Sequence, residues 1–233
     1  MNIFLAGAGG AIGRRLTPLL LDAGHRVYGL TRDAARAREL EARGVRAMIA
    51  DVYDARALRD AVAVANPEVV IHQLTDLPQA PGERGDPAGL ARNARVRVEG
   101  TKNLVAAALL CGAKRVVAQS LAFAYASGPE PHAEADPLDE SRSSVIALEG
   151  LVLSSPPLIG TVLRFGSFYG PGTWFPEPSG NVPLHVDAAA WTTLLAIQHS
   201  AAGVFNVAEE RGFVSAARAR EVLGWSPAFR LPS

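Results

Sequence analysis

The 233-residue chain contains a single cysteine and carries no net charge, with 23 basic and 23 acidic residues. Because Cys111 stands alone, the fold cannot depend on an internal disulfide. The balanced charge gives no reason to expect a nucleic-acid or membrane partner. No apolar run is long enough to span a bilayer, and the first residues lack the basic and apolar segments of a secretory signal. We therefore expect a cytoplasmic protein.

Motifs of several other chemistries are also missing. The chain has no G-x-S-x-G nucleophile motif and no glycine-lysine phosphate loop, which argues against a hydrolase triad and an NTPase. Its five histidines show no H-x-x-x-H spacing, so no metal site is expected. His72 ends an apolar run and is expected to be a packed residue of a strand rather than a ligand.

The first thirteen residues, MNIFLAGAGGAIG, join a short apolar run to three spaced glycines. Residues 11–23 then show the apolar spacing of a helix with one buried face. Gly7 permits a tight turn, Gly10 lets a pyrophosphate approach the backbone, and Gly13 lets the helix pack closely on the strand. The free N–H groups that open the helix would face the phosphates. The predicted dinucleotide contacts here are Gly7, Gly10, Ala11, Ile12 and Gly13; the alternative is a purely structural turn.

The end of the second predicted strand, residues 25–31, indicates which dinucleotide binds. An acidic residue there would hold the adenosine ribose 2′-hydroxyl, whereas an arginine can pair with a 2′-phosphate. The chain has Thr31 and Arg32 at this point, with Arg36 one helical turn later. This pattern favours NADP(H) over NAD(H). The alternative is that the arginines are solvated members of a charged helix.

Strands and helices alternate strictly through most of the chain. Strands are predicted at 2–6, 25–31, 45–50, 68–72, 114–119, 159–165 and 203–208, and helices at 11–23, 33–43, 54–65, 90–112, 139–154 and 215–223. This order predicts an α/β fold with a Rossmann-type, doubly wound parallel sheet. We expect residues 1–170 to form the NAD(P)-binding domain and residues 171–233 a small, interleaved C-terminal substrate lobe, with the strand at 203–208 in that lobe.

Several segments together resemble the short-chain dehydrogenase/reductase superfamily, in particular its extended and atypical branches of epimerase/dehydratase-type proteins. They are the G-x-x-G-x-x-G turn, VRVEGTKNLVAAAL at 96–109, the R-x-x-x-x-Y-G-P segment at 164–171 and the H-V-D segment at 185–187. The segments 172–182 and 210–215 are shorter than this resemblance implies. Either the substrate lobe is trimmed there, or loops are absent from the given chain.

The resemblance implies further cofactor contacts at the ends of two strands. Asp51 and Val52 match a pair that contacts the adenine, although Asp51 could instead cap the following helix. Gln73, Leu74 and Thr75 occupy the turn beneath the cofactor. Residues 76–89 are rich in proline and glycine and are expected to form a surface loop that can cover the site.

The catalytic residues that the resemblance implies are missing. In this superfamily a Tyr, assisted by a Lys in a Y-x-x-x-K motif, exchanges a proton with the substrate oxygen. Here Ser141 and Val145 stand at those two positions, Arg97 replaces an assisting Asn, and Leu121 replaces a Ser or Thr. The best local candidates for catalytic residues are Ser120 and Tyr125, at the carboxyl end of the fifth strand. The alternative is that both pack in the core.

Two functions fit this pattern. One is an NADP(H)-dependent oxidoreductase acting on a small carbonyl, alcohol or sugar-type substrate. The other is a catalytically silent NADP(H)-binding sensor. The resemblance also implies a homodimer joined through the helices at 90–111 and 141–154, where the first offers Leu104, Val105, Ala108 and Leu109 for packing. The same four residues could instead cover the chain's own sheet.

Overall fold

The computed structural model describes residues 1–77 and 86–232. The strands are β1 Asn2–Ala6, β2 Arg26–Thr31, β3 Arg46–Ile49, β4 Val69–His72, β5 Arg115–Leu121, β6 Ile159–Phe165, β7 Ser167–Tyr169, β8 Pro183–His185 and β9 Gly203–Val207. The helices are α1 Ala11–Asp22, α2 Ala34–Glu41, α3 Ala55–Ala65, α4 Pro87–Arg95, η2 Val96–Gly100, α5 Thr101–Leu110, η3 Glu140–Arg142, α6 Ser143–Leu153, α7 Val186–Gln198 and α8 Ala217–Leu223.

Seven strands form one parallel sheet in the order β3-β2-β1-β4-β5-β6-β9, and β7 and β8 form a separate parallel pair. The chain runs outward from β1 through β2 to β3 and then returns to the other side of β1 at β4. In open sheets of this kind the crevice at such a reversal, at the carboxyl ends of the strands, is where ligands bind. The predicted doubly wound parallel sheet is confirmed.

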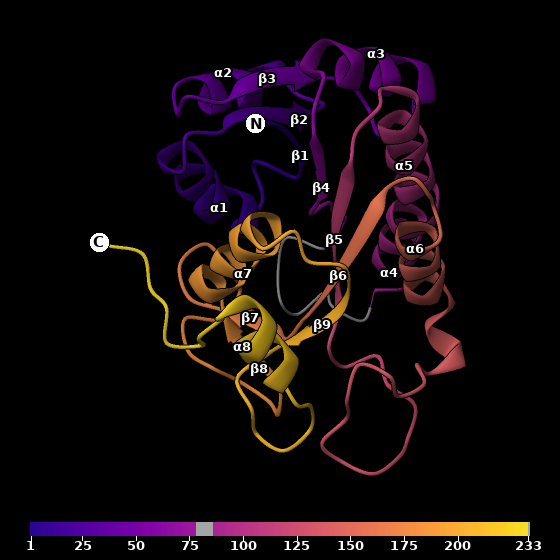
Figure 1. Ribbon diagram of the computed structural model, residues 1–233, viewed down its shortest axis with the longest axis vertical. Helices are drawn as coiled ribbons and strands as arrows, with labels where there is room; N and C mark the ends of the chain where they lie inside the picture. Colours follow the sequence, from indigo (N-terminus) through magenta and orange to yellow (C-terminus); the bar gives the residue numbers. More distant parts are fainter. Residues whose placement is uncertain (78–85, 233) are drawn as a thin grey trace.

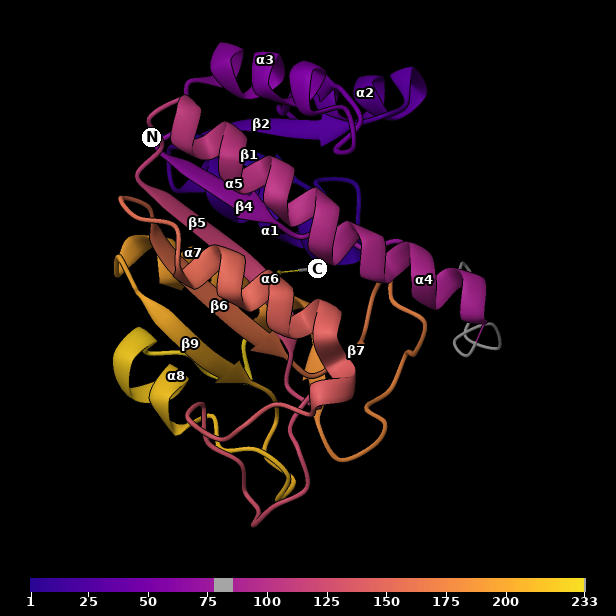
Figure 2. The same cartoon turned by 90° about the vertical axis from the view of Figure 1, so that its right-hand side faces the viewer.

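Helices cover both faces of the sheet. One core cluster packs α3, α5 and α6 onto the sheet; α5 and α6 lie in front of the sheet in Figure 2, and α3 lies at the top of that view. The other cluster joins α1, α7 and α8 to the opposite face (Figure 1). Because every central strand is buried on both faces, β4 reads Val-Val-Ile-His without a polar alternation. The predicted helix at 90–112 is a continuous rod made of α4, η2 and α5.

The C-terminal part of the chain adds elements to the main sheet. The strand predicted at 203–208 exists as β9, but its placement in a separate lobe was wrong, because β9 pairs in parallel with β6. The helix that follows the H-V-D segment, α7, packs against α1. Sequence reasoning could not see this pairing, since Gly203–Val207 meets a strand about forty residues earlier in the chain. The division at residue 170 stays a prediction.

A buried polar network ties β5, β6, β9 and α6 together. The Arg164 guanidinium donates to both carboxylate oxygens of Glu149, at 3.0 and 2.7 Å, and to the Tyr125 hydroxyl at 2.7 Å. Ser120 donates to Glu149 at 2.6 Å, and Tyr125 donates to the side-chain oxygen of Asn206 at 2.6 Å. All five side chains are buried, so their polar atoms depend on one another for partners.

Replacing Arg164 by methionine is expected to lower the free energy of unfolding by about 3–5 kcal/mol, because it leaves the Glu149 carboxylate buried without its cation. Urea unfolding followed by circular dichroism measures this change. The control is Arg59→Met, which breaks an exposed pair with Asp60 and should cost less than about 1 kcal/mol. Equal losses in the two variants would contradict a structural role for the network.

Candidate functional site

A cleft of about 480 Å³ opens at the carboxyl edge of the sheet, where the strand order reverses. The glycine turn forms one part of its wall, the ends of β2 and β3 a second, and the residues after β4 a third. Its lining residues are Gly7, Gly9, Gly10, Ala11, Arg14, Leu30, Thr31, Arg32, Arg36, Glu39, Leu40, Arg43, Ala50, Val52, Tyr53, Gln73, Leu74, Thr75, Asp76, Leu77, Val96 and Gly172.

The glycine turn has no room for side chains. Gly7 has a φ of +104°, and a Cβ built there would lie 2.7 Å from the backbone carbonyl of Gln73. A Cβ on Gly13 would collide with the carbonyl oxygen of Gly7. Gly10 is the N-cap of α1 and offers no side chain to its first turn. The first N–H groups of α1 therefore remain available to a ligand in the cleft.

Four guanidinium groups line the part of the cleft beside β2 and α2. Arg14 donates to the carbonyl of Gly9 at 2.9 Å, and Arg43 donates to the carbonyl of Arg14 at 2.7 Å. Arg32 and Arg36 make no side-chain hydrogen bond or ion pair within the residues that the structure describes. One carboxylate, that of Glu39, lines the same part of the cleft. This end of the cleft can bind an anionic group.

The turn after β4 contributes Gln73, Leu74 and Thr75, all of which line the cleft as predicted. The Gln73 side chain is buried and donates from Nε2 to Thr193 of α7 at 3.3 Å. Its Oε1 is buried without a partner among the described residues. A buried acceptor without a donor is costly, so a ligand hydroxyl or N–H that reached it would be stabilised.

Three of the predicted cofactor residues do not line the cleft. Ile12 and Gly13 face the packed interior of the glycine turn and α1. Asp51 accepts a hydrogen bond from the Tyr53 N–H at 3.0 Å, in a turn that presents Val52 to the cleft. The alternative role of Asp51 as helix cap was wrong, because the Asp54 side chain caps α3 by accepting from the backbone N–H groups of Arg56 and Ala57.

Neither predicted catalytic residue lines the cleft. The hydroxyls of Ser120 and Tyr125 are both engaged in the buried network with Glu149, Asn206 and Arg164. Tyr125 also stacks on His132 with ring centroids 4.8 Å apart. A hydroxyl held in this way is poorly placed to exchange a proton with a ligand in the cleft. Their catalytic assignment stays a prediction, and the geometry favours the core alternative.

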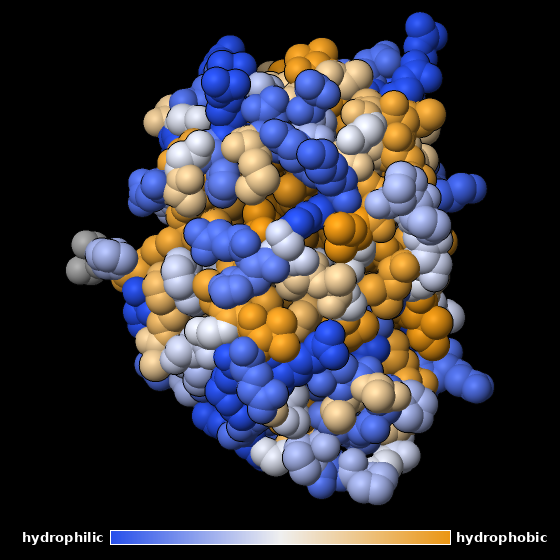
Figure 3. All heavy atoms as spheres, viewed as in Figure 1, coloured by the Kyte–Doolittle hydropathy of each residue, from blue (hydrophilic) through white to orange (hydrophobic). Residues whose placement is uncertain are grey.

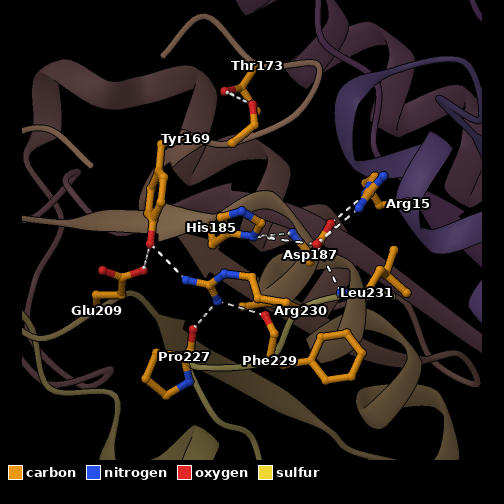
Figure 4. Close-up of polar contacts among 12 residues, drawn as sticks. Arg15, Tyr169, Thr173, His185, Asp187, Glu209, Pro227, Phe229, Arg230 and Leu231 are labelled. Atoms are coloured by element: carbon orange, nitrogen blue, oxygen red, sulfur yellow. Dashed lines mark hydrogen bonds and ion pairs between the residues drawn. The ribbon is translucent and has the colours of Figure 1, made fainter. Parts of the chain in front are cut away.

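The Y-G-P and H-V-D segments meet in a second polar cluster (Figure 4). The buried Asp187 carboxylate accepts from Arg15 of α1 and from the Leu231 N–H, while the Tyr169 hydroxyl donates to Glu209 and accepts from Arg230 at 3.0 Å. Burial and the neighbouring Glu209 raise the pKa of Tyr169 to about 12. A phenol with so high a pKa is a weak acid. Through the contacts of Asp187, the cluster holds α7 and the chain's last residues against α1.

His72 is a packed residue, as predicted. Its Nδ1 accepts from the Leu74 N–H at 3.3 Å, so Nε2 carries the hydrogen and donates to the Thr101 hydroxyl at 2.9 Å. Burial, and then the positive charge of Arg97, lower the pKa of His72 to about 4. The described residues contain no group of three His, Cys, Asp or Glu side chains that could hold a metal ion, and the expectation of no metal site stays a prediction.

The sequence did not predict several residues of the cleft, among them Arg14, Arg43, Tyr53, Val96 and Gly172. Arg14 directly follows the glycine turn, so its position was a usable signal. Gly172 comes from a segment a hundred residues further along than the strands it faces, and only the folded chain brings it to the cleft. Within the described residues, the helices are all too short or too polar to cross a membrane.

Comparisons with known proteins agree with this geometry. A family model described as NAD(P)H-binding matches residues 7–148. A 3-diazoavenalumate denitrifying reductase from Streptomyces sp is 40% identical over 240 residues, covering 90% of this chain and 76% of that protein. The fold is similar to a Thermotoga maritima UDP-glucose 4-epimerase with UDP-glucose (TM-score 0.78, 20% identity, 99% and 94% of the two chains). It is also similar to a Stenotrophomonas maltophila UDP-glucose 4-epimerase with bound NAD (TM-score 0.79, 17% identity, 97% and 93%).

The free energy of unfolding is expected to fall as the pH drops from about 6.5 toward about 4. In this range His72 binds a proton in the unfolded chain, whereas the buried ring of the folded protein stays neutral. Between about pH 7 and about pH 5 the wild type should lose about 2 kcal/mol more than a His72→Gln variant. Urea unfolding at both pH values measures the difference. The exposed His199→Gln substitution is the control and should keep the wild-type pH dependence. A wild-type dependence in His72→Gln would contradict the neutral buried ring.

Proposed function

This chain belongs to the NAD(P)H-binding family of the short-chain dehydrogenase/reductase superfamily, and from that membership we propose that it is an NADP(H)-dependent reductase whose substrate is an arenediazonium ion. Two features of the chain support this proposal: the arginines at the end of β2 and the loss of the proton-donating residues. The relative that is 40% identical is a 3-diazoavenalumate denitrifying reductase.

The cleft suits a dinucleotide. The close approach of Gly7 to Gln73, and the uncapped first turn of α1, form a cradle for a diphosphate that a Cβ at Gly7 would disrupt. Val52 and Tyr53 provide apolar surface for an adenine beyond β3. Gln73 Oε1, which has no donor within the described chain, would accept a hydrogen bond from the bound nucleotide. Leu74 and Thr75 continue this wall toward Val96.

Arg32 and Arg36 support NADP(H) as the cofactor. Both line the cleft at the end of β2, where an adenosine ribose would lie, and neither is paired within the described residues. The nearest acidic residue, Asp33, uses its carboxylate to cap α2 by accepting from Ala35 and Arg36. It is therefore committed to the helix rather than to a ribose hydroxyl. A planar guanidinium is the side chain best matched to a 2′-phosphate.

The observation that carries the reaction is the replacement of the Tyr–Lys pair by Ser141 and Val145. Val145 is buried in α6 and has no charge, and Ser141 lies in η3 with its N–H bonded to Asp139. A carbonyl reduced by hydride needs a proton at its oxygen, and these residues supply none at the family's position. Tyr169, with its raised pKa, is engaged with Glu209 and Arg230.

Reduction of an arenediazonium ion needs no proton donor. When bound, the reduced nicotinamide supplies a hydride, which forms the new aryl C–H bond as the C–N bond breaks and nitrogen leaves as N₂ with the bonding electron pair. The positive charge of the diazonium ion balances the negative charge of the hydride, so no acid or base is consumed. The chain's own residues then have only to bind, orient and shield the reactants from water.

The expected homodimer stays a prediction. Leu104, Val105 and Ala108 are buried against the chain's own sheet, which is the alternative that the sequence left open. Other apolar side chains on the same layer are exposed, including Leu110 at 72% and Ile146 at 40%. Figure 3 shows hydrophobic side chains along the edge that α5 and α6 form in Figure 1. Cytoplasmic location also stays a prediction.

Replacing Arg32 and Arg36 by alanine together should weaken NADP(H) binding by at least about tenfold, because each lost contact to a charged phosphate is worth about 1.5–3 kcal/mol. NAD(H) binding should change little. Isothermal titration calorimetry measures the dissociation constants of both nucleotides for the wild type and for the variant. Arg38→Ala removes an exposed charge from the same helix, outside the cleft, and is the control. An equal loss for both nucleotides would contradict the 2′-phosphate assignment.

A diazotised aminocinnamate should be reduced by NADPH with one N₂ formed per NADPH oxidised. Using NADPH deuterated at the transferred position, mass spectrometry should find the deuterium on the ring carbon that carried nitrogen. Tyr125→Phe should leave turnover within about threefold, because its hydroxyl is not needed as an acid. A reaction without protein corrects for direct reduction by NADPH.

The same experiment separates the other candidate functions. Turnover of aldehydes, ketones or nucleotide sugars in place of the diazonium ion would overturn the proposed substrate class. Tight NADP(H) binding with no turnover of any of these compounds would instead favour the silent sensor, the second function that the sequence allows.

A further inference from the structure

Arg97 lies on an unusual turn beside the cleft. It belongs to η2, a five-residue π-helical turn between α4 and α5. π-helical turns inside α-helices are frequent at functional sites, because they push one side chain out of the regular helical register. Its neighbour Val96 lines the cleft, and Gly100 at the end of the turn is buried against Val52. The turn therefore forms part of the cleft wall, beside Val52.

The guanidinium of Arg97 has no partner within the part of the chain that the structure describes. It is half-buried, yet it makes no hydrogen bond or ion pair there. The two other arginines of the same rod are both paired: Arg92 lies 3.8 Å from Asp76, and Arg95 lies 2.7 Å from Glu99. An arginine that gives up water without gaining an acceptor is costly, so a ligand is expected to provide one.

The surroundings of Arg97 are positive. Burial lowers the pKa of Arg97, and the positive charge of Arg142 lowers it further. The charge of Arg97 is in turn felt by His72, at the carboxyl end of β4. The Asp139 carboxylate, which interacts electrostatically with Arg142, accepts the Ser141 N–H as the cap of η3. Arg97 therefore lies close to the end of β4 and to η3. Ser141 in η3 and Val145 in the following helix α6 are the residues that replace the proton-donating pair.

We infer that Arg97, reinforced by Arg142, binds the carboxylate of an aryl carboxylate substrate and so orients the ring toward the cofactor. This inference rests on the proposed function, and it names a part of the substrate that the reaction itself does not require. The planar guanidinium matches a carboxylate through two parallel hydrogen bonds, and partial burial strengthens them. The two unpaired cation sites, Arg97 beside the cleft and Arg32 with Arg36 in it, then bind different anions.

Binding is tested with cinnamate and with cinnamamide, its uncharged counterpart, by calorimetry on protein loaded with NADP⁺. Cinnamate should bind at least about tenfold more tightly than the amide. Arg97→Met should remove that difference while leaving the affinity for cinnamamide and for NADP⁺ unchanged, and Arg97→Lys should restore part of it. Lys102→Met removes an exposed charge from the same rod and is the matched control. Arg97→Met should also unfold at the same temperature as the wild type or higher, since it removes a half-buried, unpaired charge.

Equal affinity for cinnamate and cinnamamide in the wild type would overturn the inference. A loss of NADP⁺ binding in Arg97→Met would also overturn it, because Arg97 would then belong to the cofactor site. In turnover, Arg97→Met should raise the KM for diazotised aminocinnamate by about tenfold with little change in kcat, and should leave benzenediazonium unaffected. A protein that prefers cinnamate through Arg97 but reduces no diazonium ion would support the carboxylate site and contradict the proposed reaction.

Discussion

The close contact between the glycine turn and the end of β4 is the constraint on which the rest of this structure depends. Gly7 approaches the backbone of Gln73 so nearly that a single Cβ could not be inserted, and Gly13 lies against the carbonyl of Gly7. This contact fixes where β1, β4 and α1 meet. The reversal of strand order at the same place opens the cleft there, so a tightly packed turn borders the polar cleft.

The proposed chemistry depends on which parts of the family's pattern this chain retains and which it lacks. The binding half of the family's pattern is intact, because the cradle and the wall after β4 need little more than glycines and backbone. The acid–base half is absent: Val145 cannot carry a charge, and the hydroxyls of Ser120 and Tyr125 are committed to Glu149, Asn206 and Arg164. A hydride acceptor that loses its own leaving group, as a diazonium ion does, is the class of substrate for which that loss carries no penalty.

Local patterns in the sequence predicted the parts of the structure that local forces decide. The glycine turn, the alternation of strand and helix, and the arginines after β2 could be read directly, because each depends on residues a few positions apart. The errors fall where distant segments decide. β9 joins β6 because β6 leaves an open edge of the sheet. Asp51 was the predicted alternative cap of the helix at 54–65, and the structure shows that the Asp54 side chain caps it.

Ion pairing and position together distinguish the arginines that stabilise the fold from those that we propose bind ligands. The chain has as many acids as bases, so most cations can find a partner, and Arg15, Arg95, Arg164 and Arg220 do. Arg32, Arg36 and Arg97 do not, within the residues described, although all three lie at or beside one cleft. Arg38, which is exposed outside the cleft, is also unpaired within those residues, so what distinguishes these three is their position at or beside the cleft. Their common position argues that the missing anions arrive with the ligands: a phosphate beside β2, and a carboxylate where the family's proton donors have gone.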